Sequence, residues 1–530
     1  MRLERQQIIK NVGSSWFALG VNIVVGVFLS PFILHKLGDT AFGLWVLIFS
    51  ITGYYGIFDF GIRSSIIRYV SKYTATHDIE EVSGLINTAM FTYTCVGLIS
   101  LAVTLVGCLY VDRLFKIPGN FHTTAQWLLF IVGTSVAVGF PLGVFGGMLE
   151  GLQKFYINNW VNIGFSGIIR VVLIVYFLNR GYGLLTVALI TVGLPVVASI
   201  VRAAVALHSL PLKFRWRYVD RQSFRRMAGY SGTTFIIIIA MRLRFKTDAV
   251  VIGTFLSSAA ITYFYAGARI VDYAGELVSS LAQLFVPMSS QSHAAGNIDR
   301  LRRIFVVGNR ACAFTIFPIT TCLVILGRSL IQVWLGAKYA SQGYSVLMIL
   351  IFPHTLMLMQ QASPRILFGM SKHGKLAIVT LIEGVANLVL SILLVRRWGI
   401  QGDAIGTAIP MLGTFLFFMP WHLCSRLGVR MTTYLRQAYF LPFMLCVPLA
   451  ATLVLLQRWY VPHTYRQLIP QLLIGGLVYA IGLGWVYWSD LGLKTGDLGA
   501  IPGSIVLEPI PATAQEYSDE VKPDEALESR

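Results

Sequence analysis

Long runs of apolar residues, separated by short polar segments, recur along most of the chain. A helix needs roughly 20 predominantly apolar residues to cross a hydrocarbon core, and most of the runs reach that length. Helices also satisfy their own backbone hydrogen bonds in lipid, so the pattern predicts an all-α, polytopic membrane protein with about fourteen transmembrane helices. The expected spans are 12–34, 44–66, 83–110, 124–147, 158–178, 184–206, 229–256, 259–286, 306–327, 343–368, 374–396, 402–424, 437–457 and 466–488.

The composition agrees with this pattern. Hydrophobic residues make up 56% of the 530 residues and charged residues 12%, about half the share that is usual in a soluble domain. A net charge of +18 raises the question of nucleic-acid binding, but the basic residues lie mainly in the short segments between predicted helices. We therefore expect membrane lipids, and no nucleic acid, as partners.

The basic residues favour one set of alternate loops by about two to one, and the loop 207–228 is the strongest member of that set. Because cytoplasmic loops carry the excess of Lys and Arg, this asymmetry predicts a cytoplasmic N-terminus. An even number of helices returns the C-terminus to the same side.

The two halves of the chain contain an internal repeat. The segment "SKYTATHDIEEV" (71–82) aligns with "SQSHAAGNIDRL" (290–301) at an offset of 219. At an offset of 218 the alignment continues in three further pairs: Gly151 and Gly369, Lys154 and Lys372, and Gly181 and Gly399. A repeat with an even number of helices keeps its orientation in the membrane, which predicts two six-helix bundles around a central cavity, as in transporters.

Two extra helices and an acidic tail follow the repeat. The expected domains are an N-terminal six-helix bundle (1–206), a basic cytoplasmic linker (207–228), a second six-helix bundle (229–424), two further transmembrane helices (425–490) and a disordered acidic cytoplasmic tail (491–530). A purely structural scaffold could also arise by duplication, but it would need no charges inside the membrane.

Charged residues interrupt the apolar stretch "IAMRLRFKTDAVVIG" (239–253) at Arg242, Arg244, Lys246 and Asp248. An isolated ionised side chain at the centre of a membrane helix costs about 2.5–3.5 kcal/mol, so these groups need compensation. Arg244 and Asp248 are four residues apart and can pair across one turn. Arg242 and Lys246 share a face without such an acid, so we expect them to contact water or an anion.

The next predicted helix, "YFYAGARIVDYAGELV" (263–278), places Arg269, Asp272 and Glu276 on one stripe. Arg170 and Glu383 add charge to two other predicted helices. The alternative interpretation is that these groups neutralise one another, or that long basic side chains reach the membrane surface. The nine histidines and six cysteines show no metal-ligand spacing, so no metal site is expected.

A basic chamber that opens to the bilayer suits an amphiphile with an anionic head group. Phosphate or pyrophosphate fits best, because arginine binds phosphate oxygens with two hydrogen bonds and lysine supplies a compact charge. The predicted substrate-binding residues are Arg242, Arg244, Lys246, Arg269 and Arg170. No constellation typical of an enzyme active site is evident, so a transporter rather than an enzyme is expected.

Four segments carry a resemblance to a known family: "FGLWVLIFSITGYYGIFDFGIRSSIIRYVSKY" (42–73), "DAVVIGTFLSSAAITYFYAGARI" (248–270), "QVWLGAKYA" (332–340) and "EGVANLVLSILLVRRWGIQGDAIGTAIP" (383–410). They resemble the O-antigen and polysaccharide flippases of the multidrug, oligosaccharidyl-lipid and polysaccharide exporter superfamily. The resemblance implies alternating access that carries undecaprenyl-pyrophosphate-linked oligosaccharide across a bacterial inner membrane, from the cytoplasmic to the periplasmic leaflet. It also implies a polysaccharide polymerase and glycosyltransferases as partners.

The same resemblance suggests residues for ion coupling or gating. Asp59 in "FDFG" matches a family signature and can pair with Arg63 at the i+4 position. The full set of candidates is Asp248, Asp272, Glu276, Glu383, Asp59 and Arg63, with H⁺ or Na⁺ as the coupling ion and no other cofactor.

Two alternatives stay open at this point. A multidrug or other amphiphile antiporter of the same superfamily would need an acidic chamber for cationic drugs, whereas the predicted chamber is basic. A membrane polymerase or ligase for polysaccharide would need a large extracellular loop with catalytic residues. The sequence does not specify the sugar, the coupling ion, the oligomeric state or the pathway.

Overall fold

A computed structural model describes residues 2–76, 78–210 and 218–493, and these residues form helices and turns without a β-strand. Eleven of the described segments are long and apolar enough to cross a membrane. The predicted class, an all-α polytopic membrane protein, is confirmed. The count of fourteen is not confirmed. The helices that contain the charged stretches 239–253 and 263–278 are not among the eleven segments, and one segment, Gly374–Leu427, covers two predicted spans.

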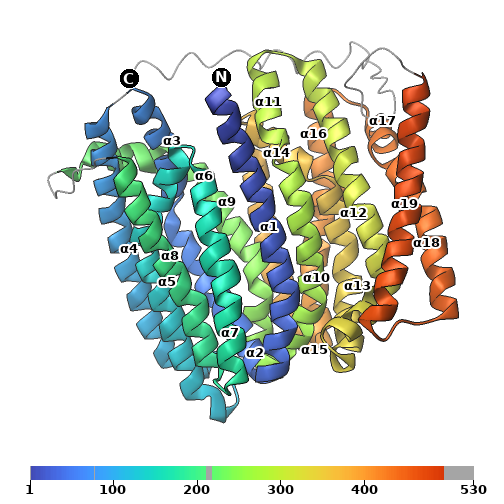
Figure 1. Ribbon diagram of the computed structural model, residues 1–530, viewed down its shortest axis with the longest axis horizontal. Coiled ribbons are helices and arrows are strands. Elements are labelled where there is room, and N and C mark those ends of the chain that lie inside the picture. The colour runs from blue at the N-terminus through green and yellow to red at the C-terminus, as the bar shows by residue number, and fades with distance from the viewer. Residues whose placement is uncertain (1, 77, 211–217, 494–530) are drawn as a thin grey trace. The chain divides into compact units, whose positions relative to one another are not determined.

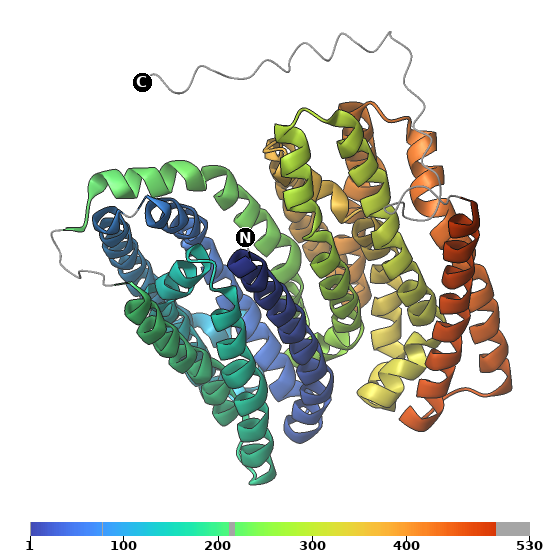
Figure 2. The same cartoon turned by 45° about the horizontal axis from the view of Figure 1, so that its top comes forward.

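The first half of the chain follows the predicted order (Figure 1). Its elements are α1 (Arg2–Leu37), α2 (Asp39–Gly53), the 3₁₀ turn η1 (Tyr54–Asp59), α3 (Ile62–Ala75), α4 (Ile79–Leu114), η2 (Gly119–Phe121), α5 (His122–Gly151), α6 (Phe155–Val161), the π-helix η3 (Asn162–Ile169), α7 (Arg170–Asn179) and α8 (Leu184–Ser209). Figures 1 and 2 both show α4, α5 and α8 side by side.

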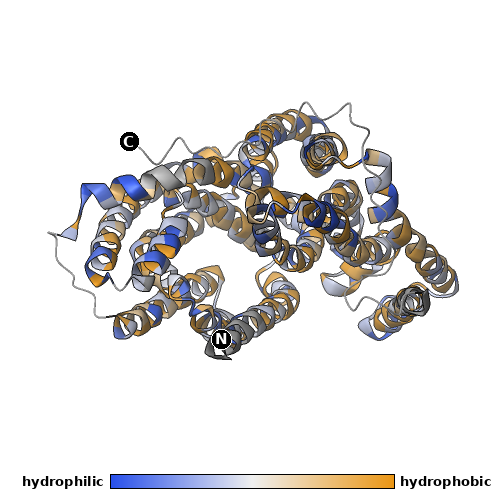
Figure 3. Ribbon diagram, turned by 90° about the horizontal axis from the view of Figure 1, so that it is seen from above, coloured by the Kyte–Doolittle hydropathy of each residue, from blue (hydrophilic) through white to orange (hydrophobic). Residues whose placement is uncertain are grey.

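The second half begins after the basic linker. Its elements are α9 (Arg221–Phe255), α10 (Ser258–Ala282), α11 (Phe285–Ala294), α12 (Ile298–Trp334), α13 (Ala337–Met359), α14 (Ala362–Gly369), α15 (Gly374–Leu412), the π-helix η5 (Gly413–Phe418), α16 (Met419–Leu427), α17 (Met431–Leu435), the π-helix η6 (Arg436–Phe440), α18 (Leu441–Trp459) and α19 (Tyr465–Leu493). Hydrophobic residues predominate along most of the helices (Figure 3), as expected of helices that cross lipid.

The helix α9 begins eight residues before the predicted span 229–256, at a polar cap. The carboxylate of Asp220 accepts a hydrogen bond from the Ser223 amide at 2.9 Å. Hydrogen bonds from the Gln222 and Ser223 amides lower the pKa of Asp220, so this cap is ionised at neutral pH. A negative charge at a helix N-terminus is favourable because it faces the positive end of the helix dipole.

The predicted span 44–66 is divided in the structure. The α2 helix continues as the 3₁₀ turn η1, and the chain then passes through Phe60 (φ 48°) and Gly61 (φ 76°) before α3 begins. Both residues have left-handed backbone conformations, which interrupt the helical hydrogen bonds. A continuous helix over 44–66 is therefore wrong, and α3 starts in a new direction.

The helical run α15 reverses direction at Gly399, which has φ 58° and ψ −139°. The two arms pack closely: a Cβ atom at Gly402 would collide with the backbone of Leu394, and one at Gly406 with Ser391. Glycine is required at both positions because the backbones approach so closely. The run thus contains two antiparallel helices, which correspond to the predicted spans 374–396 and 402–424.

The internal repeat is visible in the backbone. Gln153 and Ser371 are both non-glycine residues with left-handed conformations, φ 58° and φ 56°, and they are 218 positions apart. The turn hydrogen bonds match as well, from Lys154 N to Leu149 O (2.8 Å) and from Lys372 N to Leu367 O (2.9 Å). The same local fold therefore occurs twice.

The contacts divide the chain into two compact units that alternate along the sequence. The first contains the described residues of Met1–Tyr273, Gly327–Pro353 and Gly374–Met411, and the second contains the other described residues. The first unit holds all the predicted site residues except Glu276. The domain boundaries expected from the sequence stay a prediction.

Candidate functional site

Two cations of α9 face a glycine-rich stretch of the first bundle. Gly56 of η1 lies against the guanidinium of Arg242, because a Cβ atom at Gly56 would be 2.8 Å from Arg242 Cζ and 3.0 Å from Nε. Gly53 lies against the Lys246 side chain, because a Cβ atom at Gly53 would be 3.4 Å from Lys246 Cδ and 3.5 Å from Cε. Arg242 and Lys246 therefore do share a face, as their spacing predicts.

A third cation comes from α10. Arg269 Nη1 lies 3.7 Å from Asp272 Oδ2, and its guanidinium carbon is 4.2 Å from the centroid of the Tyr273 ring. Lys246 is within electrostatic range of Arg242, Arg269 and Asp272. We name Arg242, Lys246, Arg269 and Asp272 the cationic cluster.

The cationic cluster carries three positive groups and one carboxylate. The Asp272 side chain is 50% exposed, so solvent screens its interaction with Arg269. Within the described part of the chain, neither Arg242 nor Lys246 forms an ion pair. Buried cations are favourable only beside water or an anion, and arginine with lysine suits a phosphate group. The arrangement can therefore hold an anionic head group.

Arg244 lies on another face of α9 and is buried. Its Nη2 is 3.0 Å from Glu383 Oε1 of α15, and the two side chains are 6% and 2% exposed. Gly384 makes this approach possible, because a Cβ atom there would be 2.9 Å from Leu243 Cβ. The predicted pairing of Arg244 with Asp248 is wrong: α15 supplies the partner of each.

Asp248 belongs to a group of oxygen atoms between α9 and the two arms of α15. The Thr407 hydroxyl lies 3.1 Å from Asp248 Oδ1 and 3.1 Å from Asn387 Oδ1, and the Ser391 hydroxyl is 3.0 Å from Asn387 Oδ1. Asp403 is fully buried within electrostatic range of Asp248. We name these five residues the buried oxygen cluster.

Asp403 makes this cluster unusual. Among the described residues, the Ser391 hydroxyl donates to the Asp403 backbone carbonyl at 3.2 Å, and neither carboxylate oxygen of Asp403 accepts a hydrogen bond. A buried, unsatisfied carboxylate beside a second acid is costly unless a cation or a proton neutralises it. Oxygen atoms of this kind suit H⁺ or Na⁺. No group of three or more His, Cys, Asp or Glu suited to a metal occurs among the described residues.

Asn387, Asp403 and Thr407 were not identified from the sequence. A signal existed, because Asn387 and Ser391, and likewise Asp403 and Thr407, are polar pairs four residues apart in otherwise apolar helices. Polar residues inside membrane helices are functional candidates in their own right.

The remaining predicted residues lie elsewhere. Asp59 accepts a hydrogen bond from the Tyr93 hydroxyl, and Arg63 Nη2 is 2.6 Å from Glu150 Oε1. The predicted pairing of Asp59 with Arg63 is wrong, because the break at Gly61 separates their helices.

Two predicted site residues, Arg170 and Glu276, are not counted in the cationic cluster. Arg170 begins α7 directly after the π-helix η3, and no acceptor in the described part of the chain bonds its Nε atom. Glu276 lies in the second unit.

A further polar group joins the ends of α2, α10 and α13. Asp39, in the first turn of α2, accepts hydrogen bonds from Lys338 and Tyr339 of α13 and, at 3.4 Å, from Tyr263 of α10. The Thr262 hydroxyl also donates to the Asp39 carbonyl at 2.7 Å. One carboxylate therefore holds helices of both repeats together within the first unit.

We expect Asp39→Ala to destabilise this junction by about 1.5–3 kcal/mol, because hydrogen bonds to a charged acceptor are lost. A double variant that swaps the two charges, Asp39→Lys with Lys338→Asp, should recover only part of the lost stability. A lysine in the first turn of α2 is unfavourable because it lies at the positive end of the helix dipole. Thermal unfolding of the solubilised protein measures both, with the exposed Lys36→Gln as the control. A double variant no more stable than Asp39→Lys alone would contradict an ion-pair role.

The helical fold is shared with solved structures of membrane transporters. The lipid II flippase MurJ, in an inward closed conformation, superposes with a TM-score of 0.69 at 16% identity, covering 91% of this chain and 99% of MurJ. An inward-facing multidrug resistance MATE transporter superposes with a TM-score of 0.66 at 14% identity, covering 77% and 94%. At these identities the likeness concerns the fold.

Residues 8–293 match the family described as Polysaccharide biosynthesis protein, and the chain belongs to that family. A "Putative O-antigen transporter" of Shigella flexneri is 20% identical over 430 residues, which cover 79% of this chain and 99% of that protein. The "Uncharacterized membrane protein EpsK" of Bacillus subtilis is 20% identical over 437 residues, covering 80% and 85%. The predicted family resemblance is confirmed.

Proposed function

We propose that the protein flips a polyprenyl-pyrophosphate-linked oligosaccharide, an O-antigen or exopolysaccharide repeat unit on undecaprenyl pyrophosphate. The movement runs from the cytoplasmic to the periplasmic leaflet of a bacterial inner membrane, with both termini in the cytoplasm. Family membership and the transporter name of the Shigella flexneri relative support a transport role. A polymerase and glycosyltransferases are the partners that this role implies.

The observation that carries the proposal is the cationic cluster. Arg242, Lys246 and Arg269 come from two adjacent helices, and the glycines of α2 and η1 make room for the two α9 side chains. A pyrophosphate offers several oxygens to such a set, so it can bind several cations at once. Arg244 is engaged by Glu383, and we therefore assign it a structural role. Arg170 stays a candidate for a separate contact.

A multidrug antiporter is the alternative within the same fold. Such a transporter would bind organic cations, and the three positive side chains of the cationic cluster would repel them. The chemistry of the cluster therefore favours the lipid-linked anion.

The buried oxygen cluster is our candidate for ion coupling. A cation bound between Asp248 and Asp403 would offset the free-energy cost of burying two carboxylates. Release of the cation would restore that cost, so binding and release of the ion can be linked to the conformation of the transporter. Asp272 is exposed and Asp59 is held by Tyr93, so these two residues fit a coupling site less well.

The test is flipping in reconstituted vesicles that contain undecaprenyl-pyrophosphate-linked oligosaccharide. Exposure of the sugar at the outer leaflet is followed by a membrane-impermeant oxidant, with a potassium diffusion potential imposed. A doubly charged head gains about 4.6 kcal/mol from a potential of about 100 mV, so a potential negative on the cytoplasmic side should accelerate export. Vesicles with the protein that expose sugar no faster than protein-free vesicles would refute the proposal.

The same vesicles separate voltage from ion coupling. With no potential, an inward Na⁺ or H⁺ gradient should drive repeated cycles in the wild type. Asp248→Asn should remove that dependence while the voltage response persists. An unchanged gradient dependence in Asp248→Asn would exclude this residue from coupling.

A further inference from the structure

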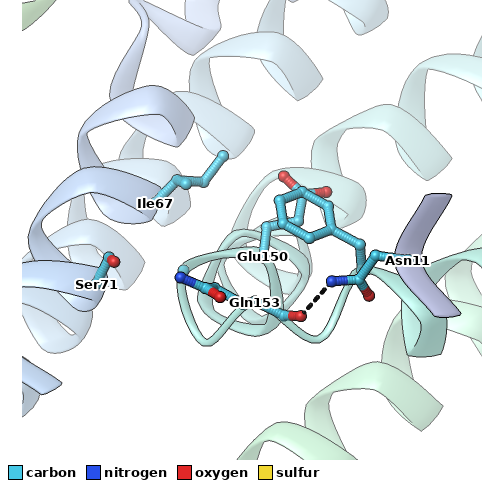
Figure 4. Close-up of a pocket in the computed structure, with 7 residues that line it drawn as sticks. Asn11, Ile67, Ser71, Glu150 and Gln153 are labelled. Atoms are coloured by element: carbon cyan, nitrogen blue, oxygen red, sulfur yellow. Dashed lines mark hydrogen bonds between the residues drawn. The ribbon is translucent and has the colours of Figure 1, made fainter. Parts of the chain in front are cut away.

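A cavity of about 400 Å³ lies where α5 ends, beside α1, α3 and the turn into α6. It is lined by Asn11, Ile67, Ser71, Glu150, Gln153 and Phe155 (Figure 4). This volume is within the range of small-molecule sites. All of these residues belong to the first unit, and they are distinct from both clusters described above.

The walls of the cavity are fixed by hydrogen bonds. Asn11 Nδ2 donates to the Gln153 carbonyl at 2.8 Å, as Figure 4 shows, and Asn11 Oδ1 accepts from the Tyr156 amide at 3.0 Å. Glu150 Oε1 is held by Arg63 Nη2 at 2.6 Å and Asn158 Nδ2 at 3.2 Å. A ligand would therefore meet a preformed surface, which lowers the entropy cost of binding.

Some polar atoms on this surface are still available to a ligand. Among the described residues, no donor reaches Glu150 Oε2, and the Ser71 hydroxyl makes no hydrogen bond. The Phe155 side chain is 38% exposed. The cavity thus offers a strong acceptor, a hydroxyl that can donate or accept, and an aromatic ring.

The surrounding charges narrow the class of ligand. Arg63 Nη2 and Arg202 Cδ both approach Gly146, at 3.8 Å and 3.9 Å from the position of a Cβ atom there. Two guanidinium groups therefore lie near the single carboxylate of Glu150 and disfavour a cationic ligand. An anionic ligand would instead meet the available oxygen of Glu150. A neutral ligand rich in hydroxyl groups fits both conditions.

We propose that this cavity binds one sugar residue of a carbohydrate. Sugar hydroxyls donate to Glu150 Oε2 and exchange hydrogen bonds with Ser71, while the apolar face of the ring packs on Phe155. The inference rests on the proposed function, because the sugar would belong to the transported lipid-linked oligosaccharide. The cavity is then a carbohydrate subsite, separate from the cations that bind the pyrophosphate.

The second repeat supports this assignment by contrast. At an offset of 218, Glu150 and Phe155 correspond to Phe368 and His373, whose rings stack at 4.8 Å. Burial lowers the pKa of His373, so this stack is uncharged at neutral pH. Both repeats contain a residue in the left-handed conformation, Gln153 or Ser371, and a glycine that closely approaches the neighbouring helix, Gly151 or Gly369. These shared features belong to the fold. Only the first repeat places an acid and an accessible aromatic ring there.

The test is saturation-transfer difference NMR on the full-length protein in detergent, with N-acetylglucosamine, methyl glucoside and methyl galactoside as probes. We expect transfer to the ring protons of at least one sugar. Phe155→Ala should lower the signal at least roughly threefold, and Glu150→Gln and Ser71→Ala should weaken binding about tenfold and about threefold, because a hydrogen bond to a charged acceptor is worth more than one between neutral groups. His373→Ala, the matched variant of the second repeat, should bind as the wild type does.

Two results would overturn the subsite. They are equal transfer in Phe155→Ala and wild type, and no transfer with any of the three sugars. The circular dichroism spectrum of each variant shows whether it is folded, and Ser71→Ala changes a side chain that makes no hydrogen bond with the described residues. A wild-type protein that flips lipid-linked oligosaccharide but binds no sugar would refute the subsite alone. Sugar binding without flipping would refute the proposed function alone.

Discussion

Replacing Arg242 and Lys246 together by alanine is expected to abolish export of the lipid-linked oligosaccharide while the protein still folds and inserts. A charge-assisted hydrogen bond contributes about 1.5–3 kcal/mol, so the loss of two phosphate contacts should lower transport by roughly two to four orders of magnitude. Folding should be spared because neither side chain forms an ion pair in the described part of the chain. Removing them even relieves an unfavourable burial of charge.

Two further variants sharpen this experiment. Lys372→Ala with Lys375→Ala removes two exposed lysines near the start of α15 and should leave transport unchanged. Gly56→Val retains both basic residues but displaces the Arg242 guanidinium, so it should also impair transport. Export at the wild-type rate in the double alanine variant would exclude the cationic cluster as the head-group site.

Replacing Glu383 by alanine is expected to destabilise the protein by about 3–5 kcal/mol, because it leaves the Arg244 guanidinium buried without its counter-charge. Replacing both residues by apolar ones of similar size, Arg244→Met with Glu383→Leu, should restore stability to nearly that of the wild type. Unfolding of the solubilised protein by heat or denaturant measures both effects.

The double variant also decides what Arg244 does. If the buried pair is structural, Arg244→Met with Glu383→Leu retains transport, since the cationic cluster is intact. Loss of transport in a double variant of normal stability would show that Arg244 contributes to substrate binding, as its position in the sequence first suggested. The single Arg244→Met variant is less informative because it leaves Glu383 buried and unpaired.

The all-α membrane class and most of the helices could be predicted from the sequence because lipid imposes one dominant rule. Every backbone polar group in the hydrocarbon region must be satisfied within its own helix, so apolar length alone locates the helices. The shared face of Arg242 and Lys246 followed from helical periodicity in the same way. Both inferences use only residues that are close in the sequence.

Ion-pair partners could not be predicted by the same reasoning. Spacing at i+4 shows which side chains can meet on one helix, but Arg244 and Arg63 are paired with Glu383 and Glu150, which are far away in the chain. These pairs depend on helix packing, and packing depends on close approaches such as that of Gly384 to Leu243. A break such as the one at Phe60 and Gly61 also shifts every later residue of a span to a different face.

The matching turns at Gln153 and Ser371 have an evolutionary consequence. An ancestor of half the length, inserted in one orientation, would have had to assemble as a symmetric pair, and each change would have appeared in both subunits. Fusion of two copies lifts that restriction. Glu150 could then diverge from Phe368 on the same backbone. For the proposed cargo, whose lipid and sugar ends differ chemically, such asymmetry is an advantage, and duplication of one fold is enough to provide it.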